Sequence, residues 1–165
     1  MSRIYPCRLV AETLFLMFFS SLSYAASVDM VINIESDSFE FHPQEEKVKY
    51  EGSVETNYQG LTLQSKRLEA YLKKDTTISV LTAYGDPAKI KRESKANSPE
   101  LFGTAGKIKL INKSDILELS DQATLAYGKS EISSPVIRFN IKTGRITAGG
   151  EGSRVSMSLN QSELE

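Results

Sequence analysis

The sequence predicts an all-β protein whose antiparallel strands are folded over into two facing layers. Three observations predict this class. Apolar residues alternate with polar ones from Val28 onward, turn-forming residues recur at intervals of about 8 to 12 residues, and one stretch of the pattern returns 69 residues later. Alternation with a period of two is typical of strands that turn one face inward.

The alternation marks the expected strands in chain order. They contain Ile32-x-Ile34, Phe39-x-Phe41, Leu61-x-Leu63, Leu68-x-Ala70-x-Leu72, Ile78-x-Val80, Ile108-x-Leu110, Leu117-x-Leu119, Ala123-x-Leu125 and Ile137-x-Phe139-x-Ile141. Only residues Ser65 to Lys74 also resemble a helix, because Leu68 and Leu72 are four residues apart. Ala70 continues the alternation between them, so we expect a strand there too.

Turn-forming residues separate these expected strands. They are His42-Pro43, Glu51-Gly52, Gln59-Gly60, Gly85-Asp86-Pro87, Tyr127-Gly128, Ser134-Pro135 and Thr143-Gly144. Residues Lys91 to Pro99 are charged and poor in apolar groups, so we expect them to form an exposed loop. The spacing favours a sandwich, a barrel or a roll.

The pattern of residues Tyr50 to Leu72 returns at Leu119 to Ile141 without a gap. Aligned positions include Val54 with Ala123, Tyr58 with Tyr127, Leu63 with Ile132, Ser65 with Ser134, and Leu68 with Ile137. Such a repeat indicates stacked structural units. We expect four hairpin units, opened by the small residues Ser36, Ser65, Ala105 and Ser134. A single hairpin cannot bury its own apolar face, so the units must stack to close a core.

The first 25 residues have the features of a secretory signal peptide. Arg3 and Arg8 precede the apolar stretch Leu14 to Leu22, and Ser23-Tyr24-Ala25 is a small-x-small cleavage site. The apolar stretch is too short for a typical membrane-spanning helix. We therefore expect a signal peptide at residues 1–25, one β domain at residues 26–159 and a polar tail at residues 160–165.

The composition of the expected mature chain excludes several classes of function. Without residues 1–25 it has 18 basic and 20 acidic residues, a balance that gives no field for nucleic acid. The single cysteine, Cys7, lies in the expected signal peptide, so packing and sheet hydrogen bonds must hold the fold. His42 is the only histidine, and we see none of the common nucleophile, zinc or phosphate-loop motifs. We expect neither an enzyme nor a cofactor or metal.

Three segments carry a resemblance to a known family. Ile32 to Asp37 reads I-N-I-E-S-D, Tyr50 to Val54 reads Y-E-G-S-V, and Ala83 to Ala88 reads A-Y-G-D-P-A. In this order, around the hairpin repeat, they resemble the LptA/OstA-like family of periplasmic lipopolysaccharide-transport proteins. The resemblance extends from Val28 to about Leu159.

The resemblance implies a twisted β-jelly roll, open at both ends, that holds the acyl chains of lipopolysaccharide between its sheets in the periplasm. It implies head-to-tail self-association, and contacts with an LptC-like inner-membrane protein and with the N-terminal domain of an LptD-like outer-membrane protein. An open roll leaves edge strands to which another roll can add. We expect these edges at Ile32 to Ser36 and at Arg154 to Leu159.

The resemblance also implies which residues contact lipid. The positions that match the family's lipid path are Ile32, Ile34, Tyr50, Ile90, Ile108 and Leu110. Inward positions of the alternating pattern extend the expected lining to Phe39, Phe41, Leu63, Leu68, Leu119, Ile137 and Phe139. An ordinary core has the same alternation, so the pattern alone does not separate a lipid path from a filled interior.

Two alternatives stay open. An LptC-like protein that keeps its N-terminal membrane anchor would share the fold, and a mature chain that begins at Ala26 would exclude it. A structural β-repeat protein with a closed core would share the strand pattern, and uptake of an acyl-chain probe would separate it from a lipid carrier.

Overall fold

The computed structural model describes residues 32–95, 98–150 and 154–159, which form one antiparallel sheet of ten strands. The expected signal peptide and polar tail lie outside the described residues. Among the described residues there is no α-helix, which agrees with the all-β prediction, and residues 65–72 are strand as expected. The open sheet confirms the predicted fold class.

The described residues contain ten strands. They are β1 (Asn33–Glu35), β2 (Ser38–His42), β3 (Lys47–Tyr58), β4 (Leu61–Leu72), β5 (Ile78–Arg92), β6 (Leu101–Ile111), β7 (Ile116–Tyr127), β8 (Ser130–Asn140), β9 (Ile146–Ala148) and β10 (Ser156–Leu159). Neighbours in sequence pair from β3 to β8, whereas β1 and β2 both pair with β3, and β9 and β10 both pair with β8.

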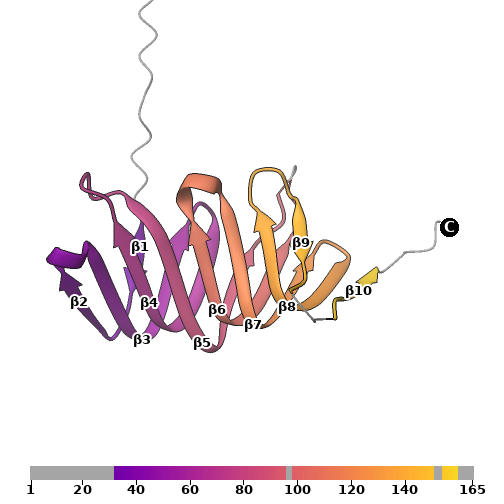
Figure 1. Ribbon diagram of the computed structural model, residues 1–165, viewed down its shortest axis with the longest axis horizontal. Helices are drawn as coiled ribbons and strands as arrows, with labels where there is room; N and C mark the ends of the chain where they lie inside the picture. The colour runs from indigo at the N-terminus through magenta and orange to yellow at the C-terminus, as the bar shows by residue number, and fades with distance from the viewer. Residues whose placement is uncertain (1–31, 96–97, 151–153, 160–165) are drawn as a thin grey trace, which may run out of the picture. The chain divides into compact units, whose positions relative to one another are not determined.

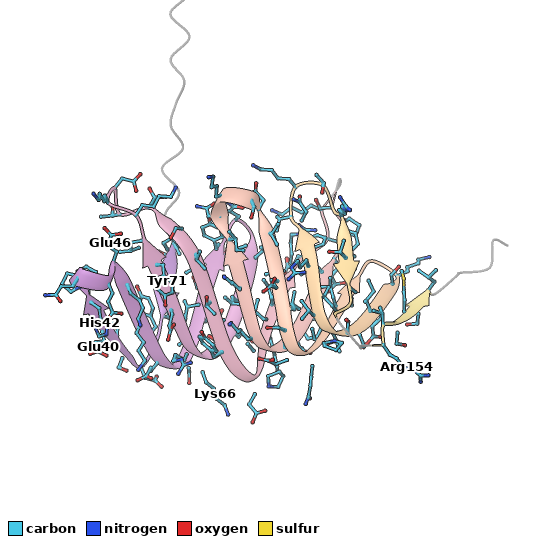
Figure 2. The ribbon with its side chains drawn as sticks, viewed as in Figure 1. Glu40, His42, Glu46, Lys66, Tyr71 and Arg154 are labelled. Atoms are coloured by element: carbon cyan, nitrogen blue, oxygen red, sulfur yellow. The ribbon has the colours of Figure 1, made fainter. Side chains whose placement is uncertain are left out.

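Every long strand changes direction near its middle. The pairings from β3·β4 to β7·β8 each contain an irregularity in register, for example between Gln64 and Arg67 and between Tyr84 and Ala88. Bulges bend strands and increase their twist. The bulges lie side by side, and we call this line the bend. Figure 1 shows the strands curving over at the lower edge of the view, where Lys66 is labelled in Figure 2.

The bend divides the sheet into two facing layers. Each strand from β3 to β8 contributes one half to each layer. Layer 1 begins with β2 at one edge and ends with β9 at the other, and layer 2 begins with β1 and ends with β10. The inward side chains of both layers form one core. The layers approach closely, because a Cβ atom on Gly103 of layer 2 would lie 2.7 Å from Leu119 Cδ2 of layer 1.

Several predicted turns lie inside strands. Glu51-Gly52 is in β3, Gly85-Asp86-Pro87 is in β5 and Ser134-Pro135 is in β8. The turn-forming residues mark the bend, where a strand must leave regular pairing, so the sequence predicted more and shorter strands than the protein has. For the same reason Ser65, Ala105 and Ser134 lie in mid-strand and do not open hairpin units.

The expected loop from Lys91 to Pro99 begins later than predicted. Lys91 and Arg92 are the last residues of β5, where they pair with Phe102 and Leu101 of β6, and Arg92 is buried. Their charge suggested a loop, but pairing with β6 extends the strand to Arg92.

The 69-residue repeat is present in three dimensions. Adding 69 to the bounds of β3 gives those of β7, and the short 3-10 turns Pro43–Glu45 and Asn112–Ser114 are related in the same way. Each turn is followed by a left-handed residue, Glu46 or Asp115, whose carbonyl oxygen accepts a hydrogen bond from the end of the hairpin. The described residues therefore contain two consecutive copies of one four-strand unit.

The outermost strands are interrupted copies of complete ones. In the second repeat, β7 pairs along its length with the two halves of β6. In the first repeat, β3 pairs in the same places with two separate short strands, β1 and β2. Likewise, β4 pairs with the two halves of β5, whereas β8 pairs in the same places with two separate short strands, β9 and β10. We call β1 with β2 the N-terminal edge and β9 with β10 the C-terminal edge. The sequence predicted β1 and β10 as edges but not β2 and β9.

Candidate functional site

The interior between the layers consists of cross-strand rows of side chains. Residues that are partners in register point to the same face of a sheet, so pairing alone traces each row from one edge to the other. Two rows of layer 1 are Phe39, Tyr50, Leu68, Ala83, Ile108, Leu119, Ile137, Ala148, and Phe41, Val48, Ala70, Leu81, Leu110, Leu117, Phe139, Ile146. A row of layer 2 is Ile34, Thr56, Leu63, Ile90, Gly103, Leu125, Ile132, Met157.

These rows are buried in the middle of the sheet and uncovered at both edges. Leu68, Leu119 and Phe139 have no exposed surface, whereas Phe39 is 70% exposed and Met157 is 56% exposed. An edge strand has a neighbour on one side only, so its inward side chains lack half of their lateral packing. The interior is thus filled centrally by the protein's own side chains and ends in apolar surface at each edge.

The structure brings together the residues that the sequence predicted as a lipid lining. Leu63, Leu68, Ile90, Ile108, Leu110, Leu119, Ile137 and Phe139 are buried in the core, and Ile32, Ile34 and Tyr50 are half-buried against it. Phe39 and Phe41 lie on interior rows by register but are exposed on β2, where Phe39 contacts the ring of Tyr50. The alternation predicts Phe39 and Phe41 as inward positions, and they are exposed because β2 pairs only with β3 and has no strand on its other side.

Sequence reasoning passed over other members of the same rows. Leu81, Leu117, Leu125 and Ile132 are as deeply buried as the predicted residues, and the alternation could have found them. Gly103 was missed for a different reason. It has no side chain, and its role appears only from the approach of the facing Leu119.

On the side opposite the bend, the strand ends of the two layers meet. We call this line the seam, and it is formed by Tyr58, Arg92 and Tyr127 from layer 2 and by Asn112, Asp115 and Phe139 from layer 1. The ring of Tyr127 lies 5.3 Å from that of Phe139, and the guanidinium of Arg92 lies 5.8 Å from the same ring. Among the described residues, the turns along the seam join strands of the same layer, and the strands pass from one layer to the other at the bend.

The Tyr58 hydroxyl shows how closely the layers approach at the seam. Burial raises its pKa above the ordinary tyrosine value, and the carboxylate of Asp115 across the seam raises it further. Hydrogen bonding to Gln59 and Asn112 acts in the opposite direction. Tyr58 is therefore neutral near pH 7, and its hydroxyl provides a polar group beside an apolar interior.

The outward faces of the layers have ordinary solvated chemistry. Glu118 accepts a hydrogen bond from Arg138 Nε at 2.7 Å across β7 and β8, and Lys49 pairs with Glu51 at 2.8 Å. One open pocket of about 300 Å³ on the outer face of layer 1 is lined by two tyrosines and two lysines, Tyr71, Tyr84, Lys107 and Lys109, with Val80 and Thr82.

The described residues offer little for metal chemistry. His42 lies on β2 at the N-terminal edge, with Glu40 as its neighbour at 3.4 Å (Figure 2). Within residues 32–95, 98–150 and 154–159, no group of three or more metal-ligating side chains is clustered. In the same ranges, no helix has the length and apolar character needed to cross a membrane.

Fold and site together define the class as an open β-jelly roll, a two-layered antiparallel sheet with an apolar interior and with strands at both ends that are paired on one side only. Residues 33–145 match the family described as LptA/(LptD N-terminal domain) LPS transport protein. The match spans more than half of the chain, and the protein belongs to this family of lipopolysaccharide-transport proteins.

A solved structure has the same fold. It is LptH from Pseudomonas aeruginosa, described as the LptA-homologous periplasmic component of the conserved lipopolysaccharide transport device. The similarity has a TM-score of 0.72 with 18% sequence identity, and it covers 80% of this chain and 96% of LptH. No significant match was found among curated proteins.

Proposed function

We propose that this protein carries lipopolysaccharide across the periplasm by holding the acyl chains between the two layers of its roll. The observation that carries the proposal is the set of apolar rows that cross the sheet from edge to edge and reach exposed Phe39, Phe41 and Met157. The lining on this account is the set of thirteen residues predicted from the sequence. The role is that of a carrier, with no catalytic step.

The physical need for such an interior follows from the cost of exposing acyl chains. Each CH₂ group in water costs about 0.8 kcal/mol, so a lipid with several chains requires a dry path through an aqueous compartment. Because the central interior is filled, chains enter as the layers separate at the seam and replace contacts between the layers. Residues 1–25 act as a signal peptide in this proposal, and residues 26–159 form the periplasmic domain.

The molecule contains a template for joining one copy to the next. Within the chain, β5 ends the first repeat and pairs with β6, which begins the second. The C-terminal edge of one copy is an interrupted β5, and the N-terminal edge of another is an interrupted β6. Two copies in line would therefore pair at these edges as β5 and β6 do within one chain. Ile146, Ala148 and Met157 of one copy would then lie opposite Phe41, Phe39 and Ile34 of the next. The three rows would continue from one copy into the other.

Charge favours the same joint. Residues 33–58, at the N-terminal edge, contain seven acidic and two basic residues, a net charge of −5. Residues 129–159, the segment that contains the C-terminal edge, include five basic and two acidic residues, a net charge of +3. Glu40 and Arg154 lie at these opposite ends (Figure 2). Opposite charge steers head-to-tail encounter and makes it sensitive to salt.

The same edges suit the two membrane partners. An LptC-like inner-membrane protein and the N-terminal domain of an LptD-like outer-membrane protein are proposed to add strands to the free edges. The bridge so formed reaches from one membrane to the other.

Site-specific photocrosslinking in cells tests the lipid path. Ile34 and Asn33 are adjacent on β1 and face opposite sides, the first packed against the core and the second exposed. We expect a photoreactive residue at Ile34 to form a lipopolysaccharide adduct and one at Asn33 to form none, because only the first faces the interior. Adducts are detected by a mobility shift and an antibody against lipopolysaccharide.

The filled centre of the roll favours one competing function, a structural β-repeat protein with a closed core. Its expected result is an absence of adducts at both positions in a protein shown to be exported and folded. Failure of the purified protein to take up a fluorescent acyl-chain probe would then support the structural role and contradict lipid transport.

Disulfide crosslinking tests the joint. Within one chain, Thr82 of β5 and Lys109 of β6 are partners in register on the outer face. At the proposed joint, Thr147 of one copy corresponds to Thr82, and Glu40 of the next copy corresponds to Lys109. In a Cys7→Ser background, we expect Glu40→Cys mixed with Thr147→Cys to give dimers under mild oxidation, and to give fewer at high salt. Lys66→Cys at the bend replaces Thr147→Cys as the control. Equal crosslinking of both pairs would exclude this joint.

A further inference from the structure

Arg92 is a cation inside the roll. It is the last residue of β5 and is only 8% exposed. Its guanidinium lies 5.8 Å from the ring centroid of Phe139, a fully buried residue of the opposite layer. The side chain therefore points from layer 2 into the space between the layers.

This guanidinium has no ionic partner among the residues that the structure describes. Among the described residues, no carboxylate lies within 4.0 Å of it, and its Nε atom is buried without a hydrogen-bond partner. Its one hydrogen bond is long, from Nη2 to the carbonyl oxygen of Pro99 at 3.5 Å. A buried charge without a partner lowers the stability of a fold, so a binding role gives this residue a reason to be there.

The position of Arg92 on the seam indicates the ligand. Tyr58 ends β3 and Tyr127 ends β7, just as Arg92 ends β5, and one strand, β4 or β6, lies between each of them and β5. Two phenol side chains therefore flank Arg92 along the seam. An amphiphile with its chains between the layers must place its polar head where the layers part, which is the seam. An arginine fork binds phosphate and carboxylate groups by paired, charge-assisted hydrogen bonds.

We propose that Arg92 binds an anionic group, a phosphate or a carboxylate, on the polar head of an amphiphile whose acyl chains occupy the interior. This inference rests on the proposed function, because it assumes that chains lie between the layers. It adds a recognition element for the head, and it gives the carrier a preference for acidic lipids over neutral ones.

Two amphiphiles with the same acyl chain test the proposal. Lysophosphatidic acid carries a phosphate and monoacylglycerol does not, so their difference in affinity isolates the head group. We expect the wild-type protein to bind lysophosphatidic acid roughly tenfold more tightly, as a hydrogen-bonded charge pair typically gives. In Arg92→Gln this preference should disappear while the affinity for monoacylglycerol stays the same. Arg138→Gln, on the outer face, is the matched control and should keep the preference.

Thermal unfolding separates binding from folding. Arg92→Met retains the length of the side chain and removes the unpaired charge, so its Tm without ligand should be no lower than that of the wild type. Lysophosphatidic acid should raise the Tm of the wild type by more than monoacylglycerol does, whereas in Arg92→Met the two amphiphiles should raise it equally. A rise of equal size in both proteins would overturn the role of Arg92.

The remaining outcomes distinguish the two proposals. Equal binding of both amphiphiles by the wild type would overturn the head-group site and leave lipid transport intact. Binding of neither would count against the proposed function itself. An Arg92-dependent rise in Tm with inorganic phosphate alone, as large as that with lysophosphatidic acid, would identify a site for free anions and overturn the assignment to a lipid head.

Discussion

Replacing Phe139 by alanine is expected to lower the free energy of unfolding by about 3 to 5 kcal/mol, the range for truncating a buried aromatic side chain. Phe139 has no exposed surface and lies against Tyr127 and Arg92 of the opposite layer. Its loss removes a contact between the layers and leaves a cavity at the seam. Because a domain of this size is stable by only about 5 to 15 kcal/mol, urea unfolding measures the change easily.

The matched control is Phe102→Ala. Phe102 has the same side chain on the outer face of layer 2, where it is 44% exposed. Its replacement should change the free energy of unfolding by far less than that of Phe139. Similar losses for both variants would mean that layer-to-layer packing at Phe139 does not stabilise the fold.

Replacing Gly103 by leucine is expected to destabilise the roll by about 1 to 3 kcal/mol or more, because a side chain there overfills the interior. A Cβ atom alone would lie 2.7 Å from Leu119 Cδ2 and 3.1 Å from Ile90 Cγ2. The layers would have to move apart along a row whose central side chains are buried. Urea unfolding again gives the free energy, and uptake of an acyl-chain probe should fall because the added side chain occupies the proposed lipid path.

A double-mutant cycle identifies the contact responsible. In a Leu119→Ala background the facing methyl groups are gone, so Gly103→Leu should cost less than it does in the wild type. Ala126→Leu adds the same side chain on the outer face of layer 2 and is the control for β-propensity. Additive effects of the two substitutions would show that the clash with Leu119 is not the cause.

The sequence predicted the class of fold because the information is local. A period of two places every second residue on one face, so Ile108, Leu119 and Ile137 could be assigned to the interior without knowing their partners. The 69-residue repeat likewise predicted corresponding hairpins, which the structure contains at residues 47–72 and 116–140.

Strand boundaries could not be predicted in the same way. Gly85-Asp86-Pro87 has the composition of a turn, and whether such a segment ends a strand or bends it depends on whether the neighbouring strands bulge at the same level. That coincidence is a property of the assembled sheet. The buried position of Arg92 is another example, because a charged residue next to a loop gives no local sign that a facing layer will cover it.

By itself, the sequence determined that the chain forms an antiparallel sheet with one apolar face, because side-chain alternation follows from the geometry of each strand alone. Only the tertiary structure decided where that sheet bends, which strands remain as edges, and which residues meet across the seam. Those features depend on bulges in neighbouring strands lining up and on two layers packing face to face, so they arise from contacts between residues far apart in the chain.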